Sequence, residues 1–180
     1  MSETGPQPYR VLPRIGVADA VRRCLQKFLT FSGRAPRAEF WKFALIVVAA
    51  LTVCGMIELA LGLPRLAVIS VEFPRTTFFA SIRGPLSAAT LLLTALPLLS
   101  AAVRRLHDTD RRGLWLALVL ASPVLLLAAG VLGARMGVMP SLPLLLLLSL
   151  VPALVVMALL AAPTQPGPNR FGPNPLEVRA

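Results

Sequence analysis

Long apolar runs separated by short charged segments make up most of this chain. Four runs, at residues 43–63, 86–103, 114–132 and 142–162, are 18 to 21 residues long and contain a single charged residue, Glu58. A helix rises about 1.5 Å per residue, so roughly 20 apolar residues cross the ~30 Å hydrocarbon core of a bilayer. The pattern therefore predicts an all-α integral membrane protein with four transmembrane helices.

A different periodicity precedes the first run. Between residues 17 and 28, apolar residues recur at helical spacing on one face and polar, mainly basic residues occupy the other, which predicts an amphipathic helix. A basic polar face suits an anionic membrane surface, so we expect a cytosolic interfacial helix. Packing of this helix on the protein's own cytosolic loops is compatible with the same pattern. The apolar face consists of Val17, Val21, Cys24 and Phe28, and the polar face of Asp19, Arg22, Arg23, Gln26 and Lys27.

The segments outside the runs differ in composition. Residues 1–16 are rich in proline and glycine, which predicts a flexible N-terminal tail, and residues 163–175 contain five prolines, which excludes a helix there. We expect residues 17–175 to form a single four-span membrane domain and residues 176–180 to be the C-terminal end. The loop at 64–85 contains two short β-prone stretches, which are compatible either with a strand pair or with an interfacial segment.

Composition supports a membrane environment. Hydrophobic residues make up 56% of the chain and charged residues 14%, whereas an average soluble protein has roughly 25% charged residues. The net charge is +10. Because the basic residues lie beside apolar runs, we expect contact with anionic lipid headgroups and not with nucleic acid. The two cysteines, Cys24 and Cys54, lack the spacing of a zinc site or a disulfide framework, so we expect no metal and no cofactor.

The positions of lysine and arginine predict the orientation of the spans. If both termini lie in the cytosol, fourteen basic residues fall on the cytosolic side and four on the outer side. The positive-inside rule favours this arrangement. It places the segment at 104–113, between the second and third spans, at the cytosolic face.

The segment at 104–113 is the densest polar stretch of the chain. It contains four arginines, two aspartates and the only histidine. The arginines have two interpretations: charges that orient the spans, each contributing about 1 kcal/mol beside an anionic leaflet, or a site for a lipid phosphate or an acidic partner segment. A guanidinium group binds oxyanions in a bidentate manner, which favours phosphate as the ligand of such a site. The four arginines are Arg104, Arg105, Arg111 and Arg112.

His107 and Asp108 are neighbours in this segment, and such a pair can orient a general base or contribute to a metal site. A metal site usually needs three or four ligands, and the sequence has no second histidine. We therefore expect His107 and Asp108 to cap the second span and to bond to neighbouring backbone or arginine groups. On the same grounds we expect that the protein is not an enzyme.

Three short patches of the predicted cytosolic face carry a resemblance to a known family. They are Gly33-Arg34-Ala35-Pro36-Arg37-Ala38-Glu39-Phe40-Trp41, Arg104-Arg105-Leu106-His107-Asp108 and Asn169-Arg170-Phe171-Gly172. In order and placement they resemble, over roughly residues 20–175, the small bacterial inner-membrane proteins catalogued as domain of unknown function 805. The resemblance implies a multi-pass protein of the bacterial inner membrane and no particular reaction. The chain departs from the family at Arg112-Gly113-Leu114-Trp115, where the family often has a Ser-Gly-Trp-Trp-like run.

The topology brings the three patches to one face and so predicts a cytosolic cluster. In our hypothesis, the basic and acidic residues of the first patch meet Asp108 and either Arg104 or Arg105, and the third patch packs over them. Charge-assisted hydrogen bonds of this kind are stronger than neutral ones. The candidate residues, as structural, headgroup-binding or partner-binding groups, are Gly33, Arg34, Arg37, Glu39, Trp41, Arg104, Arg105, His107, Asp108, Gly113, Asn169, Arg170 and Gly172.

Glu58 is a second candidate, because a carboxylate inside a membrane span is a functional candidate by default. It lies toward the outer end of the first span. There it could couple transport, reach the interface, or pair with Arg65 or Arg83.

The sequence leaves three functions open. We expect a structural or interaction protein that contacts anionic lipid headgroups, a partner protein or further copies of itself through the cytosolic cluster. The alternative is an oligomeric small-solute transporter or channel, supported by Thr90 and Thr94 on one face of the second span. The third is a membrane-embedded enzyme that acts on a lipid phosphate near His107.

Overall fold

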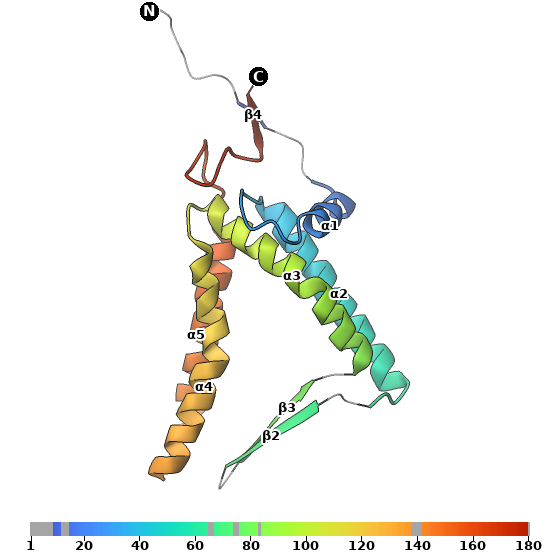
Figure 1. The fold of residues 1–180 in the computed structure, drawn as a ribbon, viewed down its shortest axis with the longest axis vertical. Helices are drawn as coiled ribbons and strands as arrows, with labels where there is room; N and C mark the ends of the chain where they lie inside the picture. The colour runs from blue at the N-terminus through green and yellow to red at the C-terminus, as the bar shows by residue number, and fades with distance from the viewer. Residues whose placement is uncertain are drawn as a thin grey trace, which may run out of the picture.

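The structure is a computed structural model that describes residues 9–11, 15–64, 67–73, 76–82, 84–137 and 142–179. Long helices make up most of it, and two short strand pairs lie outside the helices (Figure 1). The helices are α1 (Val17–Gln26), α2 (Arg37–Ala60), α3 (Pro85–Asp108), the 3-10 helix η1 (Gly113–Leu116), α4 (Ala117–Met136) and α5 (Leu142–Ala161), and the strands are β1 (Tyr9–Val11), β2 (Ala67–Phe73), β3 (Thr76–Ile82) and β4 (Glu177–Arg179).

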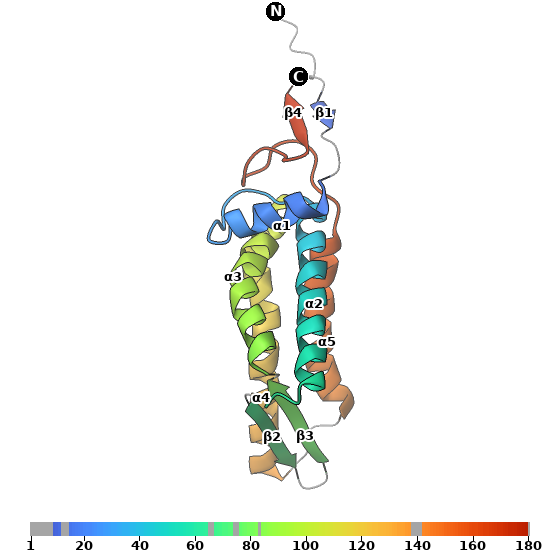
Figure 2. The same cartoon turned by 90° about the vertical axis from the view of Figure 1, so that its right-hand side faces the viewer.

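The long helices form two hairpins. α2 packs against α3, and α4 packs against α5. α1 lies across the ends of α2 and α3 and contacts both (Figure 2). β1 and β4 lie beyond this end, whereas the β2–β3 pair that connects α2 to α3 lies at the opposite end (Figure 1). The two helical hairpins diverge away from α1.

In the described part of the chain, three helices are long and apolar enough to cross a membrane. They are Arg37–Ala60, Pro85–Asp108 and Gly113–Gly133, the last of which runs through η1 into α4. They correspond to the first three predicted spans, although α2 ends at Ala60, before the predicted end at residue 63. Both α2 and α3 extend several residues further on the side of α1. Large apolar side chains on these helices are exposed, such as Leu59 at 81% and Leu92 at 77%. Such surfaces need a hydrocarbon solvent, so the chain is a predominantly helical membrane protein.

The hydrophobic core lies at the end of the helices that carries α1. Ala20 and Cys24 of α1 are fully buried there, whereas Val17 and Phe28 of the predicted apolar stripe are 49% and 42% exposed. The protein therefore buries only one edge of that stripe, and the helix ends at Gln26, before Phe28. The buried residues of the core are Cys24, Phe40, Phe43, Val47, Ala101, Ala102, Leu106, Val156 and Leu160.

The strand pairs resolve one open alternative and include one pairing that the sequence pattern did not predict. β2 pairs with β3 in antiparallel register along their full length, so the loop at 64–85 contains a strand pair. β1 pairs with β4 from the other end of the chain. Tyr9–Val11 of the predicted N-terminal tail thus form a strand, because a distant strand supplies backbone partners that the local sequence does not reveal. Residues 1–8 and 12–14 of that tail lie outside the described residues.

Glu58 joins α2 to the beginning of α3. Its side chain is 5% exposed and accepts hydrogen bonds from the backbone N–H of Gly84 at 3.1 Å and from the N–H and hydroxyl of Ser87, both at 2.7 Å. The carboxylate thus caps the N-terminus of α3, where unpaired N–H groups favour a negative charge. A Cβ atom on Gly84 would lie 2.8 Å from Glu58 Cδ, so glycine leaves room for this contact. The predicted partners Arg65 and Arg83 lie outside the described residues.

Replacing Glu58 with alanine should destabilise the α2–α3 hairpin. The change leaves two buried N–H groups and one hydroxyl without their acceptor, and each such group costs about 1–3 kcal/mol. We expect a lower midpoint of thermal unfolding in detergent micelles. Thr52→Val on the same helix is the control, because the Thr52 hydroxyl is exposed and bonds only to Val48 O of its own helix. An unfolding midpoint of Glu58→Ala equal to that of the control would contradict this role.

Candidate functional site

Five buried charged residues gather at the end of the helices that carries α1. They come from the loop before α2, the first turn of α2 and the last turns of α3, so the structure brings together two of the three predicted patches. We call them the arginine–carboxylate cluster. Its members, with their exposed fractions, are Arg34 (7%), Glu39 (2%), Arg104 (1%), Arg105 (0%) and Asp108 (0%).

Asp108 is the centre of this cluster. Its Oδ1 accepts a hydrogen bond from Arg34 Nε at 2.9 Å, and its Oδ2 accepts one from Arg105 Nη1, one turn earlier on α3. One carboxylate thus neutralises part of the charge of two guanidinium groups. Because all three side chains are buried, each depends on the others for the stabilisation that water would otherwise provide.

The remaining guanidinium donors of Arg34 and Arg105 bind backbone carbonyls. Arg34 donates to the carbonyl oxygens of Gln165 at 2.5 Å and Gly167 at 2.7 Å. Arg105 donates to Leu160 O at 3.0 Å and to Ala162 O. Leu160 belongs to the end of α5, Ala162 follows that helix directly, and the other two acceptors belong to residues 163–174, which we call the C-terminal segment. The two arginines therefore fasten that segment to α3 and to the loop before α2.

Arg37 takes a partner that differs from the hypothesis. Its Nε donates to Ala162 O at 2.7 Å, and its side chain is exposed. Arg34, three residues earlier, makes the ion pair with Asp108. The helix boundary explains the difference: Arg37 is the first residue of α2, whereas Arg34 precedes the helix and pairs with Asp108 at the end of α3.

Glu39 and Arg104 form a second buried ion pair, with 2.7 Å between Oε1 and Nη1. The carbonyl of Arg104 also accepts a hydrogen bond from Ala35 N–H at 3.0 Å. Arg104 Nε and Nη2 have no hydrogen-bond partner among the described residues. The Cys24 thiol of α1 lies beside this pair, and burial, reinforced by the negative charge of Glu39, raises its pKa from 9.0 to about 11.

The C-terminal segment also packs on His107. The rings of His107 and Phe171 stack at 3.8 Å between centroids and 4° between planes. Asn169 Nδ2 donates to His107 O at 2.8 Å, and His107 Nδ1 lies 3.3 Å from Gly33 O. All three predicted patches therefore meet. Phe171 stands inside the third patch but was not among our candidate residues, and its aromatic character was the only signal for it.

Other candidate residues have packing or turn roles. Gly33 and Gly172 adopt positive φ angles of 84° and 130°, which favour glycine. Trp41 packs edge-on against Phe40 at 5.3 Å between ring centroids. A Cβ atom on Gly113 would lie 2.9 Å from the Val103 side chain, so glycine permits close packing of η1 on α3.

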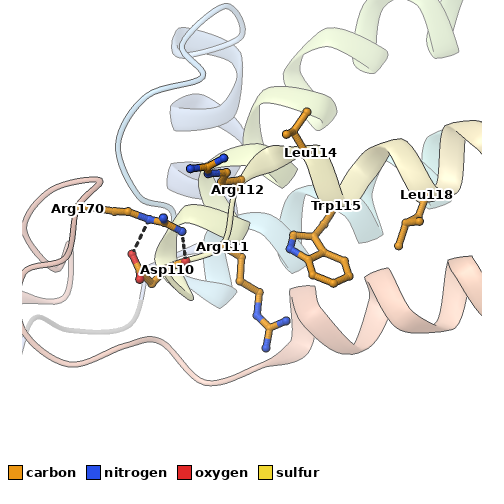
Figure 3. Close-up of a pocket in the computed structure, with 7 residues that line it drawn as sticks. All are labelled: Asp110, Arg111, Arg112, Leu114, Trp115, Leu118 and Arg170. Carbon is orange, nitrogen blue, oxygen red and sulfur yellow. Dashed lines mark hydrogen bonds and ion pairs between the residues drawn. The ribbon is translucent and has the colours of Figure 1, made fainter.

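The four arginines of the 104–113 segment separate into two pairs. Arg104 and Arg105 are buried in the cluster, which favours the structural one of the roles predicted for them. Arg111 and Arg112 are exposed and line an open cleft of about 590 Å³ (Figure 3). Among the described residues, no group of three or more His, Cys, Asp or Glu side chains is arranged to hold a metal ion. The cleft is lined by Asp110, Arg111, Arg112, Leu114, Trp115, Leu118 and Arg170.

Comparison with known proteins gives one family and two kinds of relative. The family described as Protein of unknown function (DUF805) matches residues 28–173. Inner membrane protein YhaI of Escherichia coli (strain K12) is 42% identical over 91 residues, which cover 51% of this chain and 62% of YhaI. Inner membrane protein YhaH of the same strain is 28% identical over 153 residues, which cover 85% of this chain and 93% of YhaH. No solved structure matches the chain.

Replacing Asp108 with asparagine should strongly destabilise the charged end of the protein. The change removes the negative charge shared by two buried arginines, and loss of one partner from a buried ion pair costs about 3–5 kcal/mol. We expect a lower unfolding midpoint and faster proteolysis within the C-terminal segment. Asp110→Asn is the matched control, because its pair with Arg170 is 42–49% exposed and such pairs contribute about 0–1 kcal/mol. Equal behaviour of the two variants would refute the central role of Asp108.

The Cys24 thiol should influence stability only in alkaline solution. Below pH 9.0 it is protonated in both the folded and the unfolded chain. Between pH 9.0 and about 11 the unfolded chain releases the proton while the folded chain keeps it, so the free energy of unfolding falls as pH rises. We expect the stability difference between the wild type and Cys24→Ala to shrink across this window, measured by thermal unfolding. A difference that stays constant across the window would contradict the raised pKa.

Proposed function

We propose that this chain, which belongs to the family described as Protein of unknown function (DUF805), is a structural or interaction protein of the bacterial inner membrane. The match to that family confirms the resemblance carried by the three patches. The observation that supports the proposed role is the arginine–carboxylate cluster. Its charged groups bind one another and backbone carbonyls, so they hold segments of the chain together and are not available to a substrate.

The proposed topology has four spans, with both termini in the cytosol, within one domain at 17–175. α5 is an apolar helix of 20 residues that packs on α4, and this supports a fourth crossing. An even number of crossings returns the chain to its starting side, and β1 indeed pairs with β4 beyond the same end of the helices. The excess of basic residues at this end favours the cytosol.

α1 is proposed to lie in the interface between the cytosol and the inner leaflet. It lies across the ends of α2 and α3 (Figure 2), and this orientation supports a position along the membrane surface. One edge of its apolar stripe is buried in the protein, while Val17, Leu25 and Leu29 are 49%, 48% and 62% exposed. Exposed apolar residues next to Arg22 and Arg23 suit the boundary between headgroups and hydrocarbon.

The transport and enzyme alternatives receive less support from the contacts. The hydroxyls of Thr90 and Thr94 donate to carbonyls of their own helix at 2.8 and 2.7 Å, and Glu58 caps α3, so these polar groups are engaged in structural bonds. His107 is stacked on Phe171 and faces a backbone carbonyl. We therefore propose that the end of the helices that carries α1 contacts lipid and catalyses no chemical reaction.

Purification in native-lipid particles, followed by mass spectrometry of lipids and proteins, tests this proposal. We expect anionic phospholipids to be enriched over their share of the surrounding membrane, and the enrichment to fall as salt is raised, because headgroup attraction is screened. Two results together would favour the transport alternative instead. The particles would have the lipid composition of the bulk membrane and no co-purifying protein, and proteoliposomes would show a solute flux that Glu58→Gln abolishes.

A further inference from the structure

The cleft beside the turn from α3 to η1 combines charge and apolar surface in one place. Arg111 and Arg112 come from the turn, Trp115 and Leu118 from the beginning of the next span, and Arg170 reaches in from the C-terminal segment (Figure 3). The cleft thus lies where the chain passes from basic loop to hydrocarbon-facing helix. In the proposed topology α4 crosses the bilayer, so this boundary lies at the level of the phospholipid phosphates.

The cleft carries more positive charge than its carboxylate compensates. Asp110 is its single carboxylate, and it is committed to Arg170: the Arg170 Nε lies 3.0 Å from Asp110 Oδ1, and Arg170 Nη2 donates to Asp110 O at 2.5 Å. Among the described residues, neither Arg111 nor Arg112 has a carboxylate partner. Three guanidinium groups against one carboxylate leave two net positive charges at the cleft.

The turn presents these arginines on a fixed backbone. After α3 ends, Thr109 N–H and Arg111 N–H both donate to Leu106 O, at 3.1 and 2.9 Å, and Asp110 adopts a φ of 57°. This left-handed residue reverses the chain direction, so Arg111 and Arg112 leave the helix toward solvent. The Arg111 guanidinium lies 5.9 Å from the Trp115 ring centroid, and the Arg170 guanidinium lies 4.8 Å from that of Phe171.

We propose that this cleft binds the phosphate group of an anionic phospholipid, an inference that rests on the proposed contact of this end with the anionic leaflet. Arg111, whose guanidinium lies beside Trp115, donates to the phosphate oxygens, for which the planar guanidinium fork is well suited. Arg112, whose guanidinium points to the other side of the turn (Figure 3), adds positive charge to the cleft. Trp115, with Leu114 and Leu118, contacts the glycerol and upper acyl region. These three side chains are 40%, 74% and 39% exposed, as such a contact requires. The cleft is open on its outer side, with a volume of about 590 Å³, so a headgroup can enter it from the membrane surface.

The test compares lipid retention by full-length protein variants in detergent, using native mass spectrometry and equal amounts of phosphatidylglycerol and phosphatidylethanolamine as probes. We expect the double variant Arg111→Gln/Arg112→Gln to weaken phosphatidylglycerol retention about fivefold for each arginine. The control Arg135→Gln removes one exposed arginine charge from the last turn of α4, away from the cleft and from α1, and should retain the lipid. The conservative Arg111→Lys/Arg112→Lys variant keeps the charge without the fork and should show an intermediate loss.

Each other outcome overturns a different statement. If Arg135→Gln loses phosphatidylglycerol as strongly as the single variants Arg111→Gln and Arg112→Gln, the preference is a net-charge effect and the cleft is not the site. If the cleft variant behaves like wild type while phosphatidylglycerol is still preferred, the cleft assignment fails and the proposed headgroup contact stands. If wild type shows no preference between the two lipids, both fail. If inorganic phosphate displaces the bound lipid at millimolar concentration, the ligand is a soluble phosphate and not a phospholipid.

Discussion

The contact of Asp108 with Arg34 and Arg105 determines how the rest of the charged end is built. Removing charges from water costs several kcal/mol for each ion, and one carboxylate cannot satisfy all the donors of two guanidinium groups. The remaining donors need acceptors that are not already engaged. A helix leaves its last carbonyls without intrahelical partners, and α5 offers Leu160 O to Arg105. A proline-rich segment cannot form a helix, so its carbonyls are also free, and Arg34 takes those of Gln165 and Gly167. The hydrogen bonding of the cluster therefore depends on the C-terminal segment being non-helical.

α3 is held at both ends by groups that match the polarity of its backbone dipole. At its beginning, the Glu58 carboxylate accepts hydrogen bonds from Gly84 and Ser87, where the helix carries partial positive charge. At its end, Arg104 and Arg105 supply positive charge where the helix carries partial negative charge, and each is paired with a buried carboxylate. Since α2 carries both Glu58 and Glu39, the two ends of α3 are bonded to the two ends of one neighbouring helix. In a membrane, where hydrocarbon gives no hydrophobic drive for helices to associate, such polar contacts fix the pairing and register of α2 and α3.

The sequence was sufficient to predict the features that depend on composition over long stretches. Runs of about 20 apolar residues predict membrane-spanning helices whatever their neighbours are, and the charges of an apolar chain must gather where water or counter-charges are available, so the meeting of the three patches could be foreseen. The individual partners could not. Arg34 and Arg37 are three residues apart, and only the start of α2 at Arg37 decides which of them faces Asp108. Backbone carbonyls carry no residue identity, so no pattern could indicate Gln165 O or Ala162 O as acceptors. The β1–β4 pair joins segments at opposite ends of the chain and has no local periodicity to reveal it.

The separation of the four arginines between residues 104 and 112 follows from where α3 ends. Arg104 and Arg105 lie in the last turns of α3, where α2, α5 and the loop before α2 cover the helix, and both are buried. The helix ends at Asp108, and the positive φ of Asp110 turns the chain outward, so Arg111 and Arg112 are exposed although they lie only a few residues further on. The same side chain therefore has opposite surroundings on the two sides of one turn. Inside, its charge is paired with a buried carboxylate, and outside, its charge is available to an external anion. Because Asp110 makes the turn and also neutralises Arg170, this residue links the buried cluster to the exposed cleft without sharing in the hydrogen bonds of the cluster itself.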